Sequence, residues 1–92
     1  MKITKRGGNV VIYDDEKVVK SVLKANAKIT EEELSPPKAS YIANEVFTRL
    51  TKDKEVITTQ DVRDYVYSVL CEMGLPLTAK EYIEYKKTKY AK

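Results

Sequence analysis

The chain begins with two short runs of hydrophobic and β-branched residues that are typical of strands. These runs are Lys2–Lys5 and Val10–Tyr13, and Arg6-Gly7-Gly8-Asn9 separates them. Because a Gly-Gly pair supplies the positive φ angles of a tight turn and β-branched residues favour pleated flanks, the pattern predicts a β-hairpin. An isolated hairpin is only marginally stable, so we expect it to pack against the rest of the chain.

Two helices are predicted in the first half of the chain after the hairpin. Asp14 suits the N-cap of a helix over residues 15–28, whose acidic first turn complements the positive end of the helix dipole. Ser35-Pro36 predicts the start of a second helix that reaches about residue 51. Between these helices, Thr30–Glu33 resembles a capping box, which we expect to start only a short turn because two prolines follow closely.

Two further helices are predicted in the second half. Thr58–Asp61 combines a cap with an acidic residue, and apolar residues then recur at helical spacing as far as Met73. Gly74 ends this third helix, and Pro76 starts a fourth that reaches about Tyr90. The predicted fold class is therefore α+β and mainly α, with a small N-terminal β-hairpin or three-stranded cap (residues 2–13) on a four-helix bundle (residues 14–90).

The length of 92 residues is typical of one small domain, and we expect residues 1–92 to form a single domain. The chain has no long apolar run and no secretory leader, so we expect no membrane span and a cytoplasmic location. It contains no His and a single cysteine, Cys71, which excludes an internal disulfide, the usual zinc sites and Ser-His-Asp or Cys-His catalysis. We therefore expect no catalytic residue, no structural metal and no enzymatic activity.

Charge is distributed unevenly along the chain, although the net charge is only +3. Residues 1–28 carry a net charge of +4, residues 29–85 carry −5, and residues 86–92 add four lysines. If the two cationic ends meet in the fold, they form a face suited to a polyanion such as a nucleoside triphosphate or a nucleic-acid backbone. The alternative is that these lysines only keep the chain soluble.

The residues around the predicted hairpin turn form a candidate phosphate site. The two commonest phosphate-binding motifs, Gly-x-x-x-x-Gly-Lys-Ser/Thr and Gly-x-Gly-x-x-Gly, are both missing from the sequence. Lys5 and Arg6 stand beside the turn, and Lys17 lies in the first turn of the next predicted helix, where backbone amides and the helix dipole favour an anion. Arg supplies a bidentate fork and Lys a mobile point charge for a triphosphate. The alternative is a cationic β-turn that binds nothing.

Four segments of the chain also resemble the successive motifs of a known family. They are Ile3–Gly8, Tyr13–Val18, Ile57–Val66 and Ala79–Lys86. In this order they are similar to the ATP-cone, and the resemblance covers nearly the whole chain. It implies a small β-cap over a four-helix bundle, which agrees with the elements predicted above.

The resemblance also implies a function. ATP-cones are regulatory domains that bind ATP or dATP, and they occur at the N-terminus of ribonucleotide reductases and in the bacterial repressor of their genes. There they report the ratio of the two nucleotides by changing how subunits associate, and they carry out no chemistry. The resemblance thus implies an adenine nucleotide with Mg²⁺ as the ligand, and a homo-oligomer or a ribonucleotide reductase subunit as the partner.

The family's binding residues fall first on the predicted cap. The resemblance implies that Lys5 and Arg6 contact phosphates and that Val11 and Ile12 line the base pocket. Asp14 would recognise the base or only cap the first helix.

The remaining implied binding residues lie on the helices. Lys17 would reach a phosphate or the ribose, and Thr59 and Arg63, one helical turn apart, would face the ribose and phosphates. Lys86 or Lys87 would close the site from the last helix, or both would be solvated charges. Lys86 stands where the family usually has Arg, which reduces a bidentate contact to a single charge, and Gly7 stands where it usually has Asp or Asn.

The tyrosines allow two interpretations. Tyr65 and Tyr82 fall at core spacing, so we expect them to pack, whereas Tyr13 or Tyr85 could stack on a base. Two alternatives to nucleotide sensing stay open: a nucleic-acid-binding module that uses the cationic termini, and a plain helical dimerisation or interaction domain. The acidic middle of the chain and the lack of an Arg/Lys-rich helix argue against nucleic acid.

Overall fold

The computed structural model describes residues 2–4, 10–53 and 57–90, and leaves out the side chains of residues 2, 4, 11, 53 and 85–90. In this part of the chain, Lys2–Thr4 (β1) and Val10–Ile12 (β2) form a two-stranded antiparallel sheet, with Ile3 opposite Val11. The connecting residues lie outside the described part. The hairpin turn and the third strand of the cap therefore stay predictions.

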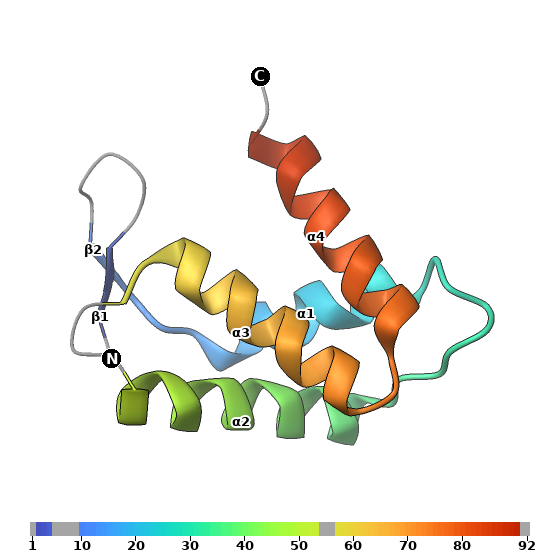
Figure 1. The fold of residues 1–92 in the computed structure, drawn as a ribbon, viewed down its shortest axis with the longest axis horizontal. Helices are drawn as coiled ribbons and strands as arrows, with labels where there is room; N and C mark the ends of the chain where they lie inside the picture. Colours follow the sequence, from blue (N-terminus) through green and yellow to red (C-terminus); the bar gives the residue numbers. More distant parts are fainter. Residues whose placement is uncertain (1, 5–9, 54–56, 91–92) are drawn as a thin grey trace.

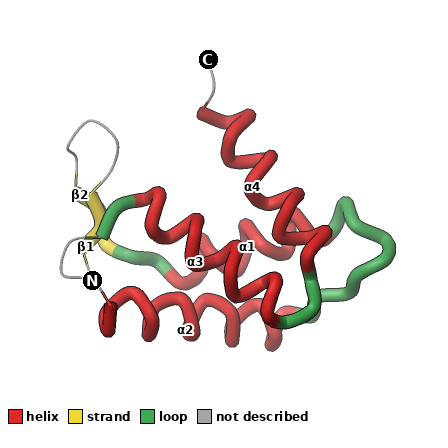
Figure 2. Tube along the Cα trace, viewed as in Figure 1, coloured by secondary structure: helices red, strands yellow, loops and turns green. Residues whose placement is uncertain are grey.

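Four helices follow the sheet in the described residues: α1 (Asp15–Asn26), α2 (Pro36–Asp53), α3 (Thr59–Glu72) and α4 (Pro76–Tyr90). The prediction of a small, mainly helical protein is confirmed (Figure 2). None of these helices has the length and apolar character needed to cross a membrane.

Local sequence signals explain where these helices begin. Asp14 caps α1, because its carboxylate accepts a 2.9 Å hydrogen bond from the backbone N–H of Glu16. Before α3, the Thr58 hydroxyl accepts from the N–H of Asp61 (3.1 Å), and the Asp61 carboxylate accepts from the N–H of Thr58 (2.9 Å). This reciprocal pair is a capping box, so both predicted caps are confirmed.

Gly74 ends α3 in a left-handed conformation with φ +78°. Its N–H donates to the carbonyl of Cys71 (3.1 Å), and the N–H of Leu75 donates to the carbonyl of Leu70 (2.9 Å). This is the Schellman pattern, which satisfies carbonyls that the end of a helix would leave unpaired. The chain can then reverse, and Pro76 starts α4 at once.

The helices pack in a ring in which α1 and α3 each contact both α2 and α4. Both α1 and α3 begin at the end of the bundle that carries β1 and β2, which we call the sheet end (Figure 1). α4 leaves the opposite end at a steep angle, and its C-terminal half stands apart from the other helices in this view.

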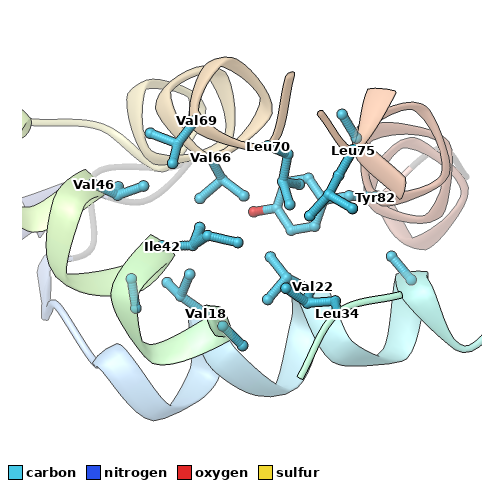
Figure 3. Close-up of a cluster of buried hydrophobic side chains, with 14 of the residues drawn as sticks. Val18, Val22, Leu34, Ile42, Val46, Val66, Val69, Leu70, Leu75 and Tyr82 are labelled. Carbon is cyan, nitrogen blue, oxygen red and sulfur yellow. The ribbon is translucent and has the colours of Figure 1, made fainter. Parts of the chain in front are cut away.

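Most of the core between the helices is built from apolar positions at helical spacing, and Ile3, Tyr13, Leu34, Ile57 and Leu75 join it from outside the helices. Figure 3 shows side chains from all four helices meeting there, with Tyr82 pointing into the middle. The buried members are Ile3, Tyr13, Val18, Val22, Ala25, Leu34, Ala39, Ile42, Ala43, Val46, Leu50, Ile57, Val66, Val69, Leu70, Leu75, Ala79 and Tyr82. Tyr65 packs partly buried against this cluster, so the packing role expected for Tyr65 and Tyr82 is confirmed.

The segment between α1 and α2 differs from its prediction. Thr30–Glu33 forms no helical turn, and the Thr30 hydroxyl donates to the side chain of Glu31 (2.8 Å) rather than capping a helix. Within this segment, Glu32 is the residue that caps a helix, and that helix is α4. Its carboxylate oxygens accept from the backbone N–H groups of Leu77 (2.9 Å) and Thr78 (2.8 Å).

Candidate functional site

The start of α1 contributes the first described part of the candidate site. Asp14 and Lys17 are both exposed, and Lys17 lies in the first turn of the helix. The carboxylate of Asp14 holds one backbone N–H of this turn. The capping role of Asp14 is therefore established, and its recognition of a base stays a prediction. Asp15 and Glu16 make this first turn acidic, so Lys17 is the group at the start of α1 that can attract an anion.

The start of α3 contributes the second part. Because Thr58 forms the capping box, the half-buried Thr59 is not needed to cap the helix. Arg63 is also half-buried, and its guanidinium donates to the side-chain oxygen of Gln60 (3.2 Å). Gln60 in turn donates to the carboxylate of Asp64 (2.8 Å), so the first two turns of α3 carry a connected set of polar side chains.

These two helix starts lie at the same end of the bundle, beside β1 and β2 (Figure 1). Two residues separate β2 from α1, so Asp14 and Lys17 follow the sheet directly. The fold thus brings one sheet and two helix N-termini to the sheet end. The caps already accept from one N–H group in each first turn, so an anionic ligand at this junction would be held mainly by the side chains of Lys17 and Arg63.

The structure describes the other predicted site residues only in part or not at all. Lys5 and Arg6 lie outside the described residues, and Val11 is placed only by its pairing with Ile3 in the sheet. Lys86 and Lys87 lie in the C-terminal half of α4, without described side chains. Their binding roles stay predictions.

The outer face of β2 is apolar and exposed. Ile12 is 71% exposed and Val10, two residues earlier on the same face of the strand, is 60% exposed. An apolar surface next to a helix N-terminus could take a nucleotide base, since bases bury their faces on such side chains. The placement of Ile12 in a base pocket stays a prediction.

Tyr13 is not available to stack on a base, which corrects the expectation that Tyr13 or Tyr85 could do so as far as Tyr13 is concerned. It is 9% exposed, and its ring packs against Phe47 with a centroid distance of 5.6 Å. Its hydroxyl donates to the carbonyl of Ala43 (2.9 Å). Burial, together with the nearby charges of Asp15 and Tyr82, raises the pKa of Tyr13 well above its ordinary value, so the neutral phenol persists.

A shallow pocket of about 270 Å³ lies between α1 and α2 and was not predicted. It is lined by Asp15, Glu16, Val19, Lys20 and Ser40. Its volume is below the roughly 300–1,000 Å³ usual for ligand pockets. None of the predicted binding residues is among its lining residues. Sequence spacing carries no signal for it, because it depends on how α1 packs against α2.

Two other polar contacts also join elements that are distant in sequence. Arg49 of α2 donates to both carboxylate oxygens of Glu72 on α3, at 2.7 and 2.6 Å. The hydrogen bonds from Arg49 lower the pKa of Glu72 below its ordinary value.

Among the described residues, no group of three or more acidic, His or Cys side chains could hold a metal ion.

Comparison with known proteins adds one finding to this geometry. Residues 1–90 match the family model of the ATP cone domain. A search of curated proteins found no match to the chain.

Proposed function

The chain belongs to the ATP cone domain family, and on that premise we propose that it binds ATP or dATP at the sheet end of the bundle. Domains of this family are regulatory modules that bind these nucleotides as effectors. We propose further that the bound nucleotide controls the association of this chain with a second copy or with a ribonucleotide reductase subunit. The nucleotide would act as a signal and leave unchanged.

The observation that carries the proposal is the family match over nearly the whole chain. The arrangement at the sheet end supports it. A polyphosphate needs cations, and Lys17 in the first turn of α1 supplies one. Thr59 and Arg63, at the start of α3, add a hydroxyl and a guanidinium at the same end of the molecule.

The proposed role of each binding residue is the one that membership of this family implies for its position. Lys5, Arg6 and Lys17 bind phosphates, and Thr59 and Arg63 face the ribose and phosphates. The base lies between Val11, Ile12 and Asp14, and Lys86 or Lys87 closes the site from α4. Mg²⁺ accompanies the nucleotide, held by phosphate oxygens and water as is usual for this ion.

Calorimetric titration of the whole chain with ATP, dATP, ADP and GTP tests the proposal. We expect saturable binding of ATP and dATP and no comparable binding of GTP. Analytical ultracentrifugation of the same samples tests the second step, and we expect the distribution of oligomers, or the binding of an added reductase subunit, to depend on the nucleotide. Failure of ATP and dATP to bind at millimolar concentration would contradict the proposal.

A further inference from the structure

The first turn of α4 is capped by a residue from another part of the chain. Helix N-termini leave several backbone N–H groups without partners, and a side chain just before the helix usually satisfies one of them. Here the carboxylate of Glu32, in the segment between α1 and α2, accepts from the N–H groups of both Leu77 and Thr78. Burial disfavours its charge, but these hydrogen bonds outweigh that effect and lower the pKa of Glu32.

Asn26, the last residue of α1, joins the same cluster. Its side-chain amide donates to the backbone carbonyl of Glu32 (3.0 Å) and to the hydroxyl of Thr78 (3.0 Å). Its side-chain oxygen accepts from the N–H of Leu34 (3.1 Å). Thr78 is completely buried. The end of α1, the following segment and the start of α4 are thus joined by hydrogen bonds that are half-buried, apart from the exposed bond from Leu77 to Glu32.

This cluster lies at the opposite end of α4 from the lysines assigned to nucleotide binding. Lys86 is ten residues beyond Pro76, which corresponds to about 15 Å along a helix. A tilt of about 10° at the start of α4 would therefore move residue 86 by about 2–3 Å. A shift of this size is comparable to the length of a charge-assisted hydrogen bond, which is about 2.7–2.9 Å. The C-terminal half of α4 stands apart from the other helices (Figure 1), so the direction of α4 is set by its N-terminal half, where Glu32 holds the first turn and Ala79 and Tyr82 are buried in the core.

We propose that Glu32 is a positioning residue for nucleotide binding, which caps α4 and thereby fixes where Lys86 and Lys87 lie. The inference rests on the proposed function, because it assumes that these lysines contribute to the nucleotide site. Glu32 itself does not touch the nucleotide. It acts through the direction of α4.

The test compares two neighbouring carboxylates. Glu32→Ala removes the cap, whereas Glu33→Ala removes the same charge from the next residue, which is exposed. Measured by calorimetry at a temperature where both variants are folded, Glu32→Ala should weaken ATP binding about tenfold. Glu33→Ala should bind within about twofold of the wild-type chain. Equal affinities of Glu32→Ala and the wild-type chain would overturn the inference.

A double-mutant cycle separates positioning from a general loss of structure. In a chain that already carries Lys86→Ala and Lys87→Ala, Glu32→Ala should have no further effect on affinity, because the groups that it positions are gone. A full tenfold loss in that background would show that Glu32 acts otherwise and would overturn the inference.

The inference stays testable even if one variant does not fold. If Glu32→Ala does not fold, Glu32→Gln replaces it, since this variant keeps one oxygen as an acceptor and should show a smaller loss in the same cycle. Unchanged affinity of a folded Glu32→Gln would then contradict the inference.

If the wild-type chain binds neither ATP nor dATP, the proposed function fails and this inference fails with it. If the wild-type chain binds and the Glu32 variants bind equally well, only the inference fails.

Discussion

The hydroxyl of Tyr13 donates a 2.9 Å hydrogen bond to the backbone carbonyl of Ala43, 30 residues further along the chain. Tyr13 is the first residue after β2, and Ala43 lies within α2. The contact therefore fixes the junction between the sheet and α1 to the neighbouring helix. Asp14 and Lys17 follow this junction directly, so Tyr13 holds the start of α1 in place from within the core.

Replacing Tyr13 with Phe should remove this hydrogen bond and keep the ring contact with Phe47. We expect the free energy of unfolding to fall by about 1 kcal/mol, the usual value of one neutral hydrogen bond. Urea denaturation measures the change. Tyr41→Phe is the matched control, because Tyr41 is 56% exposed and its replacement should change stability by less than about 0.5 kcal/mol. Equal effects of the two changes would contradict the assignment.

The stability of the wild-type chain should also fall at alkaline pH because of Tyr13. Burial, and secondarily the charges of Asp15 and Tyr82, raises the pKa of Tyr13 in the folded state above the ordinary value of 10.0. Above that pH, the unfolded chain loses the phenolic proton while the folded chain keeps it, so the unfolded state is favoured. The stability advantage of the wild-type chain over Tyr13→Phe should therefore shrink between pH 7 and about pH 11. A constant difference between the two proteins would refute this prediction.

The fold should require glycine at position 74 because the backbone there is left-handed, and not because a larger side chain would lack room. An added Cβ would have nothing within 4 Å, but φ is +78°. We expect Gly74→Ala to destabilise the fold by about 1–2 kcal/mol, the cost of a left-handed L-residue. Gly74→Asn should cost less, because Asn tolerates this conformation. Thermal unfolding of the two variants makes the comparison, and an Asn variant no more stable than the Ala variant would argue against a conformational cause.

Lys17→Ala should weaken ATP binding without destabilising the fold. Loss of one charge-assisted phosphate contact costs about 1.5–3 kcal/mol, which is roughly tenfold or more in affinity. Lys20→Ala is the matched control, since Lys20 is also exposed on α1 but lines the pocket between α1 and α2. Calorimetric titration of both variants with ATP gives the result. Equal losses of ATP affinity in Lys20→Ala and Lys17→Ala would mean that binding depends on the overall charge of the chain and not on a contact with Lys17.

The parts of the fold that the sequence predicted correctly are governed by local interactions. The cap of Asp14 and the box of Thr58 with Asp61 join residues at most three positions apart, so their spacing is visible in the sequence. The apolar faces of the helices were predicted for the same reason, since helical periodicity repeats within a few residues.

The parts that were missed depend on partners distant in sequence. The segment Thr30–Glu33 was interpreted as a local capping box, but the hydrogen-bond partners of Glu32 within it are 45 and 46 residues away. Tyr13 was one of two tyrosines considered for base stacking, and its burial against Phe47 could not be predicted because that contact depends on the packing of α2. The binding residues rest on the family resemblance, because no local pattern specifies how the ends of a sheet and several helices combine into one site.

Binding of ATP at the sheet end is tested by titrating the isotopically labelled chain with ATP and following the shifts of assigned backbone amide resonances. We expect saturable shifts that cluster at the two helix starts of the sheet end, over Asp14–Lys17 and Thr59–Arg63. Absence of any shift with ATP or dATP, or shifts confined to the pocket residues Val19 and Ser40, would contradict this expectation.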